Sequence, residues 1–195
     1  MPDRNPTVAP WLRQLPNALT VLRLALVLPI ALLLWRRQDA LALALFLIAA
    51  LSDWADGAMA RAWGLQSRFG AVADPIADKL STLAAAGVLT LQGTLPGWYL
   101  LAMLLRDLVI VGGAAAWRLR FGRLEIAPSV LSKLNTTLQF GLLLGALGLR
   151  AELLGAGVWW QLLLAAAFAT TLASGAHYVW TWGRAARRRA VRAPG

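Results

Sequence analysis

Six apolar runs of about 20 residues, joined by short connections, constrain the fold of this chain more than any other feature. A helix needs about 20 mostly apolar residues to cross a hydrocarbon core of about 30 Å. Short connections make neighbouring helices antiparallel. The sequence therefore predicts an all-α integral membrane protein with six transmembrane helices, at residues 16–35, 40–62, 71–91, 96–117, 130–149 and 158–182.

The composition agrees with a single membrane domain over residues 1–195. Hydrophobic residues make up 59% of the chain and charged residues 14%, against about 25% charged in soluble domains. We expect residues 1–15 to lie along the membrane surface and residues 183–195 to form a basic cytoplasmic tail. The chain has no cysteine, which excludes disulfides and thiolate metal sites.

The net charge of +10 could indicate a nucleic-acid partner, but basic residues that flank membrane spans explain it better, and we expect no nucleic acid. Twelve arginines fall on one side of the predicted spans and three on the other. This bias predicts that both termini are cytoplasmic. The smaller group consists of Arg36, Arg37 and Arg150.

The N-terminal sequence has neither the pattern of a secretory signal peptide nor that of a transit peptide. Asp3 precedes the first apolar run, and no small-residue cleavage site follows a short apolar segment. We therefore expect the first span to be retained, in a bacterial cytoplasmic membrane.

Four aspartates interrupt the apolar pattern at the second and third spans. Asp53 and Asp56 are three residues apart, and Asp74 and Asp78 are four apart. Each spacing places both carboxylates on one helix face. If the two helices form an antiparallel hairpin, all four carboxylates converge near its cytoplasmic end.

Four converging carboxylates repel one another unless they are protonated or bind cations. Carboxylate oxygens without histidine or cysteine ligands favour Mg²⁺, Mn²⁺ or Ca²⁺ over zinc. A structural alternative is a set of aspartate pairs with arginine or lysine, or an ion path. Gly57 and the surrounding alanines favour the metal, because small residues let a ligand approach the backbone. Arg61 follows one turn later, where its forked donors could hold a metal-bound pyrophosphate.

The stretch from Asp53 to Asp78 reads Asp-x2-Asp-Gly-x2-Ala-Arg-x8-Gly-x3-Asp-x3-Asp. It resembles the signature of the CDP-alcohol phosphotransferase family, and all eight fixed residues are matched at the fixed spacing. The layout of six spans, with the signature across the second and third, is similar to the fold of that family. The resemblance covers nearly the whole chain.

The resemblance implies transfer of a phosphatidyl-type group from a CDP-linked donor to an alcohol, with release of CMP. It implies two ions of Mg²⁺ or Mn²⁺, bound by Asp53, Asp56, Asp74 and Asp78. It also implies that Asp78 is the general base. The pocket for CDP-diacylglycerol would be shaped by Gly57, Ala60, Arg61 and Gly70. Members of the family are commonly dimeric, so a homodimer is expected from the resemblance alone.

The acceptor alcohol has to be recognised by other residues, and three basic residues inside predicted spans are candidates. Arg23, Arg106 and Lys133 either extend to the membrane surface or line a pocket for an anionic acceptor. The run Ser132-Lys133-Leu134-Asn135-Thr136 and the pair Arg106-Asp107 resemble those of cardiolipin synthases in this family. Phosphatidylglycerophosphate synthases typically carry a second lysine where this chain has Asn135.

Phosphatidylglycerol carries one negative charge, whereas glycerol 3-phosphate carries about −1.5 to −2, by analogy with phosphorylated side chains. A less positive pocket therefore favours phosphatidylglycerol. Asp107 would lower the positive field further, although consecutive helical residues do not share a face. We expect cardiolipin synthesis, with phosphatidylglycerophosphate synthesis as the alternative. A cation channel or transporter with an acidic ring is an alternative of another class.

Overall fold

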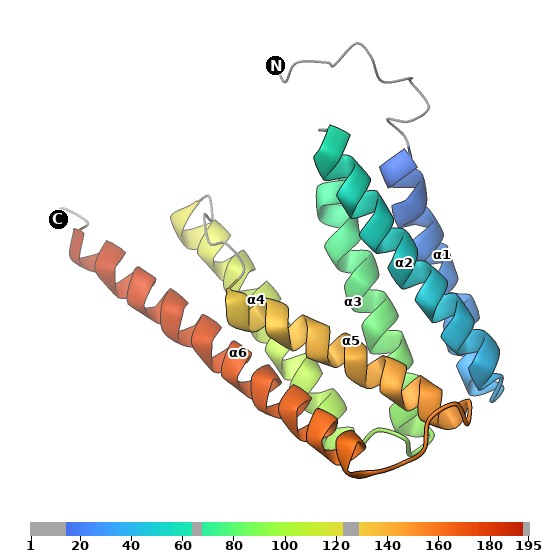
Figure 1. Ribbon diagram of the computed structural model, residues 1–195. Coiled ribbons are helices and arrows are strands. Elements are labelled where there is room, and N and C mark those ends of the chain that lie inside the picture. Colours follow the sequence, from blue (N-terminus) through green and yellow to red (C-terminus); the bar gives the residue numbers. More distant parts are fainter. Residues whose placement is uncertain (1–14, 64–67, 123–128, 193–195) are drawn as a thin grey trace. The chain divides into compact units, whose positions relative to one another are not determined.

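The computed structural model describes residues 15–63, 68–122 and 129–192, and they form six helices without a strand (Figure 1). Residues 1–14, most of the predicted surface segment, lie outside the described part. The helices are α1 (Leu15–Trp35), α2 (Asp39–Trp63), α3 (Arg68–Leu91), α4 (Gly97–Phe121), α5 (Val130–Arg150) and α6 (Val158–Arg192). Each of the six predicted segments is helical, so the all-α prediction is confirmed.

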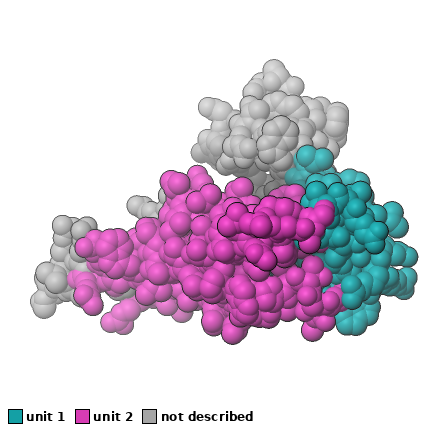
Figure 2. All heavy atoms as spheres, turned by 60° about the horizontal axis from the view of Figure 1, so that its bottom comes forward, with its two compact units in different colours: residues 1–89, 147–154 teal, residues 90–146, 155–195 magenta. Residues whose placement is uncertain are grey.

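The chain divides into two compact units, which are coloured separately in Figure 2. The first unit, called unit 1, comprises residues 1–89 and 147–154. Unit 2 comprises residues 90–146 and 155–195. Helix α5 contributes its last turn to unit 1 and the rest of its length to unit 2.

In unit 1, α1 and α2 pack against each other as an antiparallel hairpin (Figure 1). Ile30 and Leu34 on α1 and Ala42, Phe46 and Ala49 on α2 are buried. The alternation of large and small side chains allows close approach of two helices without a gap. This hairpin fixes the direction in which α2 runs toward its aspartates.

Helices α1 and α5 are both followed by a Schellman turn, in which one residue just beyond the helix has a positive φ. At the end of α1, the amide of Arg37 donates to the carbonyl of Leu34 at 3.1 Å, and the amide of Gln38 donates to that of Leu33 at 2.9 Å. Arg37 has a φ of 61°. The end of α5 has the same pattern, with Glu152 at a φ of 58°.

In unit 2, α4 and α6 run in the same direction and pack together, while α5 runs the opposite way (Figure 1). Gly113 on α4 lies directly under the ring of Trp182 on α6, so closely that a Cβ at this position would lie 1.6 Å from Cζ3 of the ring. Gly175 on α6 lies against the side-chain carbons of Arg106. Small residues at contacts between helices are typical of membrane proteins.

Many large apolar side chains are exposed on α4 and α6, among them Leu101, Leu105, Leu108, Leu162 and Leu172. Among the described residues, two helical segments are long and apolar enough to cross a membrane, Gly97–Arg120 and Val158–Arg187. The segments Val21–Trp35 and Asp39–Ser52 are apolar but shorter. Two of the six predicted spans therefore meet this criterion within the described residues.

Helix α6 has 35 residues and is therefore about 52 Å long. A hydrocarbon core is about 30 Å thick, so α6 is longer than a span requires. The helix continues to Arg192, through most of the segment that was predicted to be a basic tail.

Candidate functional site

The signature stretch is helical on both sides of residues 64–67, which lie outside the described part. Asp53 and Asp56 belong to α2, and Asp74 and Asp78 belong to α3. The helical backbone keeps each pair on one face, because residues three or four apart are neighbours on a helix. The side chains of Asp53, Asp56 and Asp74 lie outside the described residues, as do those of the predicted CDP-binding residues Gly57, Ala60, Arg61 and Gly70.

Asp78 is the signature aspartate whose side chain the structure describes, and it is half-buried. The neighbouring Ala77 is fully buried. The hydroxyl of Thr82 donates to the backbone carbonyls of Asp78 and Lys79, at 2.9 and 3.1 Å. Asp78 is thus held on a regular turn of α3 at the edge of the core of unit 1.

Arg23 on α1 is 5% exposed. It belongs to the same unit as the signature helices. An ionised side chain inside an apolar helix is costly unless it faces polar groups within the bundle. Its burial weighs against extension of this side chain to the membrane surface, and its predicted contact with the acceptor stays a prediction.

The donor set of the signature fits a pair of hard divalent cations by its chemistry. It consists of four carboxylates on two helices, and it contains no nitrogen or sulfur ligand. Oxygen donors of this kind suit Mg²⁺ and Mn²⁺. The residues with described side chains contain no cluster of three metal-ligating groups, and Asp78 is the one signature aspartate among them.

Arg106 lies at the centre of a polar cluster in unit 2, which we call the Arg106 cluster. Its Nη1 lies 2.9 Å from Oδ1 of Asp107. Its Nη2 donates to the hydroxyls of Ser132 at 2.7 Å and Ser174 at 3.3 Å. Arg106 is 4% exposed, so one guanidinium joins α4, α5 and α6 inside the unit. The ion pair forms between consecutive residues, which the helical spacing had argued against.

The two other acceptor candidates of unit 2 lie in different environments, although they are two residues apart on α5. Lys133 is exposed. Asn135 has no exposed surface, and its Oδ1 accepts hydrogen bonds from the hydroxyls of Thr171 at 2.8 Å and Thr170 at 3.2 Å. Gln139 extends this contact to α6 through the hydroxyl of Thr171. Asn135 therefore holds α5 against α6, and its predicted contact with the acceptor remains untested.

Sequence reasoning missed Ser174, Thr170 and Thr171, which are the α6 partners of Arg106 and Asn135. Positions 170, 171 and 174 are the polar positions of an otherwise apolar stretch, residues 162–176. Residues three and four apart lie on one face of a helix. This spacing therefore indicated in the sequence that α6 has a polar face, which the structure packs against α4 and α5.

An apolar groove of about 410 Å³ lies between α4 and α6 in unit 2. Trp98, Leu101, Leu105, Phe168 and Leu172 are among the residues that line it. Arg106 and Thr171 also line it, and no lining residue is acidic, so the groove is a mainly apolar surface that suits an apolar ligand such as a lipid tail.

A family model for CDP-alcohol phosphatidyltransferases matches residues 13–173. The chain belongs to the CDP-alcohol phosphatidyltransferase family. The matched region includes the whole signature and all members of the Arg106 cluster except Ser174. The resemblance noted in the sequence is therefore confirmed.

Similar members of the family have two different names. A protein of Mycobacterium tuberculosis named "Putative cardiolipin synthase" is 37% identical over 98 residues, which are 50% of this chain and 47% of that protein. The CDP-diacylglycerol–glycerol-3-phosphate 3-phosphatidyltransferase of Yersinia enterocolitica is 38% identical over 107 residues, or 53% of this chain and 58% of that enzyme. The protein of the same name in Cereibacter sphaeroides is 36% identical over 132 residues, or 64% of this chain and 59% of that protein. The chain thus spans about half to three-fifths of the length of these relatives.

Proposed function

We propose that this chain transfers the phosphatidyl group of CDP-diacylglycerol to an alcohol and releases CMP. The observation that carries the proposal is the complete signature from Asp53 to Asp78 on α2 and α3, within a chain of this family. In the reaction, the alcohol oxygen forms a bond to the phosphorus that bears the diacylglycerol. The bond from that phosphorus to the CMP oxygen breaks, and the alcohol proton goes to a base.

The residues of the signature have separate roles in this proposal. The guanidinium of Arg61 binds the pyrophosphate of the donor through its paired donors. Gly57, Ala60 and Gly70 leave room for the nucleotide beside the backbone. Asp78 accepts the proton of the alcohol, because a positioned carboxylate can act as a general base. Two Mg²⁺ or Mn²⁺ ions bound by the four aspartates would neutralise charge on the attacking and leaving oxygens.

We propose phosphatidylglycerol as the acceptor and cardiolipin as the product. The support comes from the charge of the Arg106 cluster, where Asp107 pairs with the guanidinium at 2.9 Å and reduces its net charge. Lys133 then contributes one exposed positive charge on α5, which matches a phosphodiester with a single negative charge. Phosphatidylglycerol also partitions into the bilayer through its own tails, which lowers the demand for charge in the pocket.

Glycerol 3-phosphate is the second candidate acceptor. The relatives from Yersinia enterocolitica and Cereibacter sphaeroides carry that substrate in their names. A phosphomonoester would place up to about two negative charges in the pocket. Its binding would therefore depend on more positive charge than Lys133 and a paired Arg106 provide.

The test is product analysis with the purified protein in detergent and lipid micelles. The protein is given CDP-diacylglycerol with phosphatidylglycerol and glycerol 3-phosphate at matched concentrations. Cardiolipin with CMP is the expected product, and activity should disappear with EDTA and return with Mg²⁺ or Mn²⁺. Accumulation of phosphatidylglycerophosphate without cardiolipin would establish the second acceptor. Full turnover in excess EDTA would refute the two-metal reaction.

We further propose that the signature faces the cytoplasm of a bacterial cell and that all six helices span its cytoplasmic membrane. The arginine bias of the sequence supports this orientation. A cation channel or transporter of the same topology would not exchange labelled CMP into CDP-diacylglycerol. Reversible exchange of this kind therefore separates an enzyme from a channel.

A further inference from the structure

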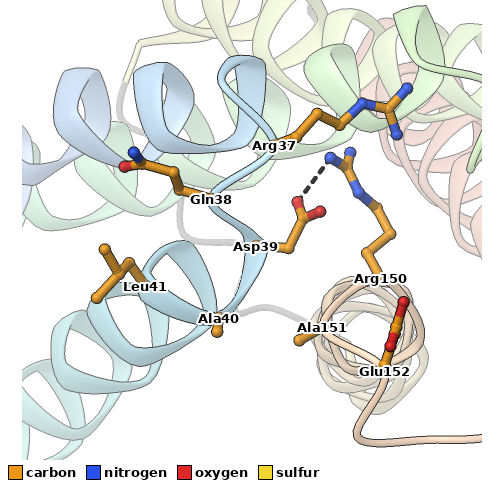
Figure 3. A pocket seen from close by; sticks show the side chains of 8 residues that line it. All are labelled: Arg37, Gln38, Asp39, Ala40, Leu41, Arg150, Ala151 and Glu152. Atoms are coloured by element: carbon orange, nitrogen blue, oxygen red, sulfur yellow. Dashed lines mark ion pairs between the residues drawn. The ribbon is translucent and has the colours of Figure 1, made fainter.

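Unit 1 contains a pocket of its own, at the end of α2 that is remote from the signature. Its volume is about 350 Å³, and residues 37–41 and 150–152 line it (Figure 3). Asp39, at the start of α2, lies fourteen residues before Asp53, which is about 21 Å along the helix axis. The pocket is therefore separate from the proposed catalytic carboxylates.

Two charged residues of this pocket have a backbone conformation that normally favours glycine. Arg37 lies in the turn after α1 and has a φ of 61°, and Glu152 lies in the turn after α5 and has a φ of 58°. Glycine is the usual residue at this position of a Schellman turn, because a Cβ is strained there. Non-glycine residues in this region often occur at binding sites, where the surrounding structure maintains the strain. Here both strained residues carry a full charge, and both line the same pocket.

Of the four charged side chains that line the pocket, two form an ion pair with each other and two do not. Arg150 is paired with Asp39 at 2.6 Å and also donates to the carbonyl of Leu34. The side chains of Arg37 and Glu152 have no hydrogen-bond or ion-pair partner among the described residues. In Figure 3 the guanidinium groups of Arg37 and Arg150 lie on the same side of the pocket. A pocket with an available cation and an available anion suits a ligand that has both charges.

The apolar residues beside the pocket indicate where such a ligand comes from. Trp35 is 60% exposed and Leu41 is 59% exposed, and they lie at the end of α1 and the start of α2. Tryptophan at a helix end favours the boundary between lipid and water. In the membrane placement proposed above, on which this step depends, the pocket lies at the headgroup level of the leaflet opposite the signature.

We propose that this pocket binds the headgroup of a zwitterionic aminophospholipid of the phosphatidylethanolamine class. The phosphate accepts hydrogen bonds from the guanidinium of Arg37, beside that of Arg150, because arginine can bind phosphate with two parallel donors. The ammonium group donates to the carboxylate of Glu152. Leu41 contacts the apolar part of the lipid. Binding involves no covalent change and does not require turnover at the signature.

The experiment measures retained lipid by native mass spectrometry of the purified full chain in detergent. The protein is mixed with equal amounts of phosphatidylethanolamine and phosphatidylglycerol of the same acyl chains. Wild-type protein should retain phosphatidylethanolamine in preference. Arg37→Gln should lower the retention of both lipids roughly tenfold, the usual effect of losing a charge-assisted hydrogen bond. Glu152→Gln should abolish the preference while leaving phosphatidylglycerol retention unchanged.

Arg36→Gln is the matched control, because Arg36 is the adjacent exposed arginine and does not line the pocket. It should retain lipid as the wild type does. Arg37→Gly removes the charge and relieves the positive φ, so it should lose lipid without a lower unfolding temperature. Equal losses in Arg36→Gln and Arg37→Gln, or wild-type retention of phosphatidylglycerol equal to that of phosphatidylethanolamine, would overturn the proposal. Neither outcome bears on product formation from CDP-diacylglycerol, so the two proposals fail separately.

Discussion

The ion pair between Asp39 and Arg150 joins three helix ends of unit 1 and offers a quantitative test of its packing. Oδ1 of Asp39 lies 2.6 Å from Nη2 of Arg150, and the side chains are 11% and 7% exposed in that order. The same Nη2 donates to the carbonyl of Leu34 at 3.4 Å. One guanidinium therefore connects the end of α1, the start of α2 and the end of α5.

Removing one partner of a buried pair leaves the other charge without compensation, which costs about 3–5 kcal/mol. The low end applies here, because the pocket keeps the pair in partial contact with solvent. Asp39→Asn and Arg150→Gln should each lower the free energy of unfolding by about 3 kcal/mol. The double variant contains no uncompensated charge, so it should lose less than either single variant. The coupling energy of the cycle is then at least about 3 kcal/mol.

Exchange of the two charges, Asp39→Arg with Arg150→Asp, tests the same pair against the helix dipoles. Asp39 lies in the first turn of α2 and Arg150 in the last turn of α5, and both signs are favourable there, by about 0.5 kcal/mol each. Reversal makes both unfavourable, so the exchanged protein should lose about 2 kcal/mol, less than either single variant. Reversible unfolding in mixed SDS micelles, followed by tryptophan fluorescence, gives these values. Additive losses in the double variant would refute the coupling.

Two further predictions concern unit 2 and the proposed pockets. Gly113→Ala should lower the free energy of unfolding by about 2 kcal/mol, because the new Cβ would lie 1.6 Å from the ring of Trp182. Gly112→Ala is the control and should be neutral or stabilising, because no atom lies within 4 Å of its Cβ position. Equal free energies of unfolding for the two variants would contradict the close contact. Arg61→Ala should raise the KM for CDP-diacylglycerol, and Lys133→Ala that for the acceptor, each about tenfold. Steady-state kinetics with identical donor defects in both variants would contradict separate pockets.

The number and order of helices could be predicted from the sequence, because hydrophobic runs of membrane length are a strong signal. The end of α6 could not. The predicted span stopped at Trp182, where arginines begin, but alanine and arginine favour helix as strongly as apolar residues do, and α6 continues to Arg192. The turns at Arg37 and Glu152 were also unreadable, because the usual sequence signal for such a turn is glycine.

The candidate site was predictable where it depends on fixed spacing and unpredictable where it depends on long side chains. The register of the four aspartates follows from helix geometry alone, and the structure places them on helices α2 and α3 as predicted. The pairing of Arg106 with Asp107 could not be read from spacing, since consecutive residues point in different directions on a helix. The guanidinium is long enough to fold back to its neighbour while still reaching Ser132 and Ser174.

The burial of Asn135 changes how acceptor choice should be tested. In the sequence analysis, asparagine in place of lysine at position 135 was interpreted as the loss of one positive charge from the acceptor pocket. Asn135 has no exposed surface, and its Oδ1 accepts from Thr170 and Thr171. A lysine there would bury an ammonium group between two helices, next to hydroxyls that have lost their acceptor, which is strongly unfavourable.

Asn135→Lys alone is therefore expected to lower the free energy of unfolding by several kcal/mol without converting the product to phosphatidylglycerophosphate. In the proposed acceptor pocket, the exposed positive charge is that of Lys133, and Asp107 reduces the net charge of Arg106. Asp107→Asn removes that modulation, so it should shift the ratio of kcat/KM values toward glycerol 3-phosphate in the competition assay. If Asn135→Lys converts the product and Asp107→Asn leaves the ratio unchanged, acceptor choice depends on the α5–α6 interface and the argument from accessible charge is wrong.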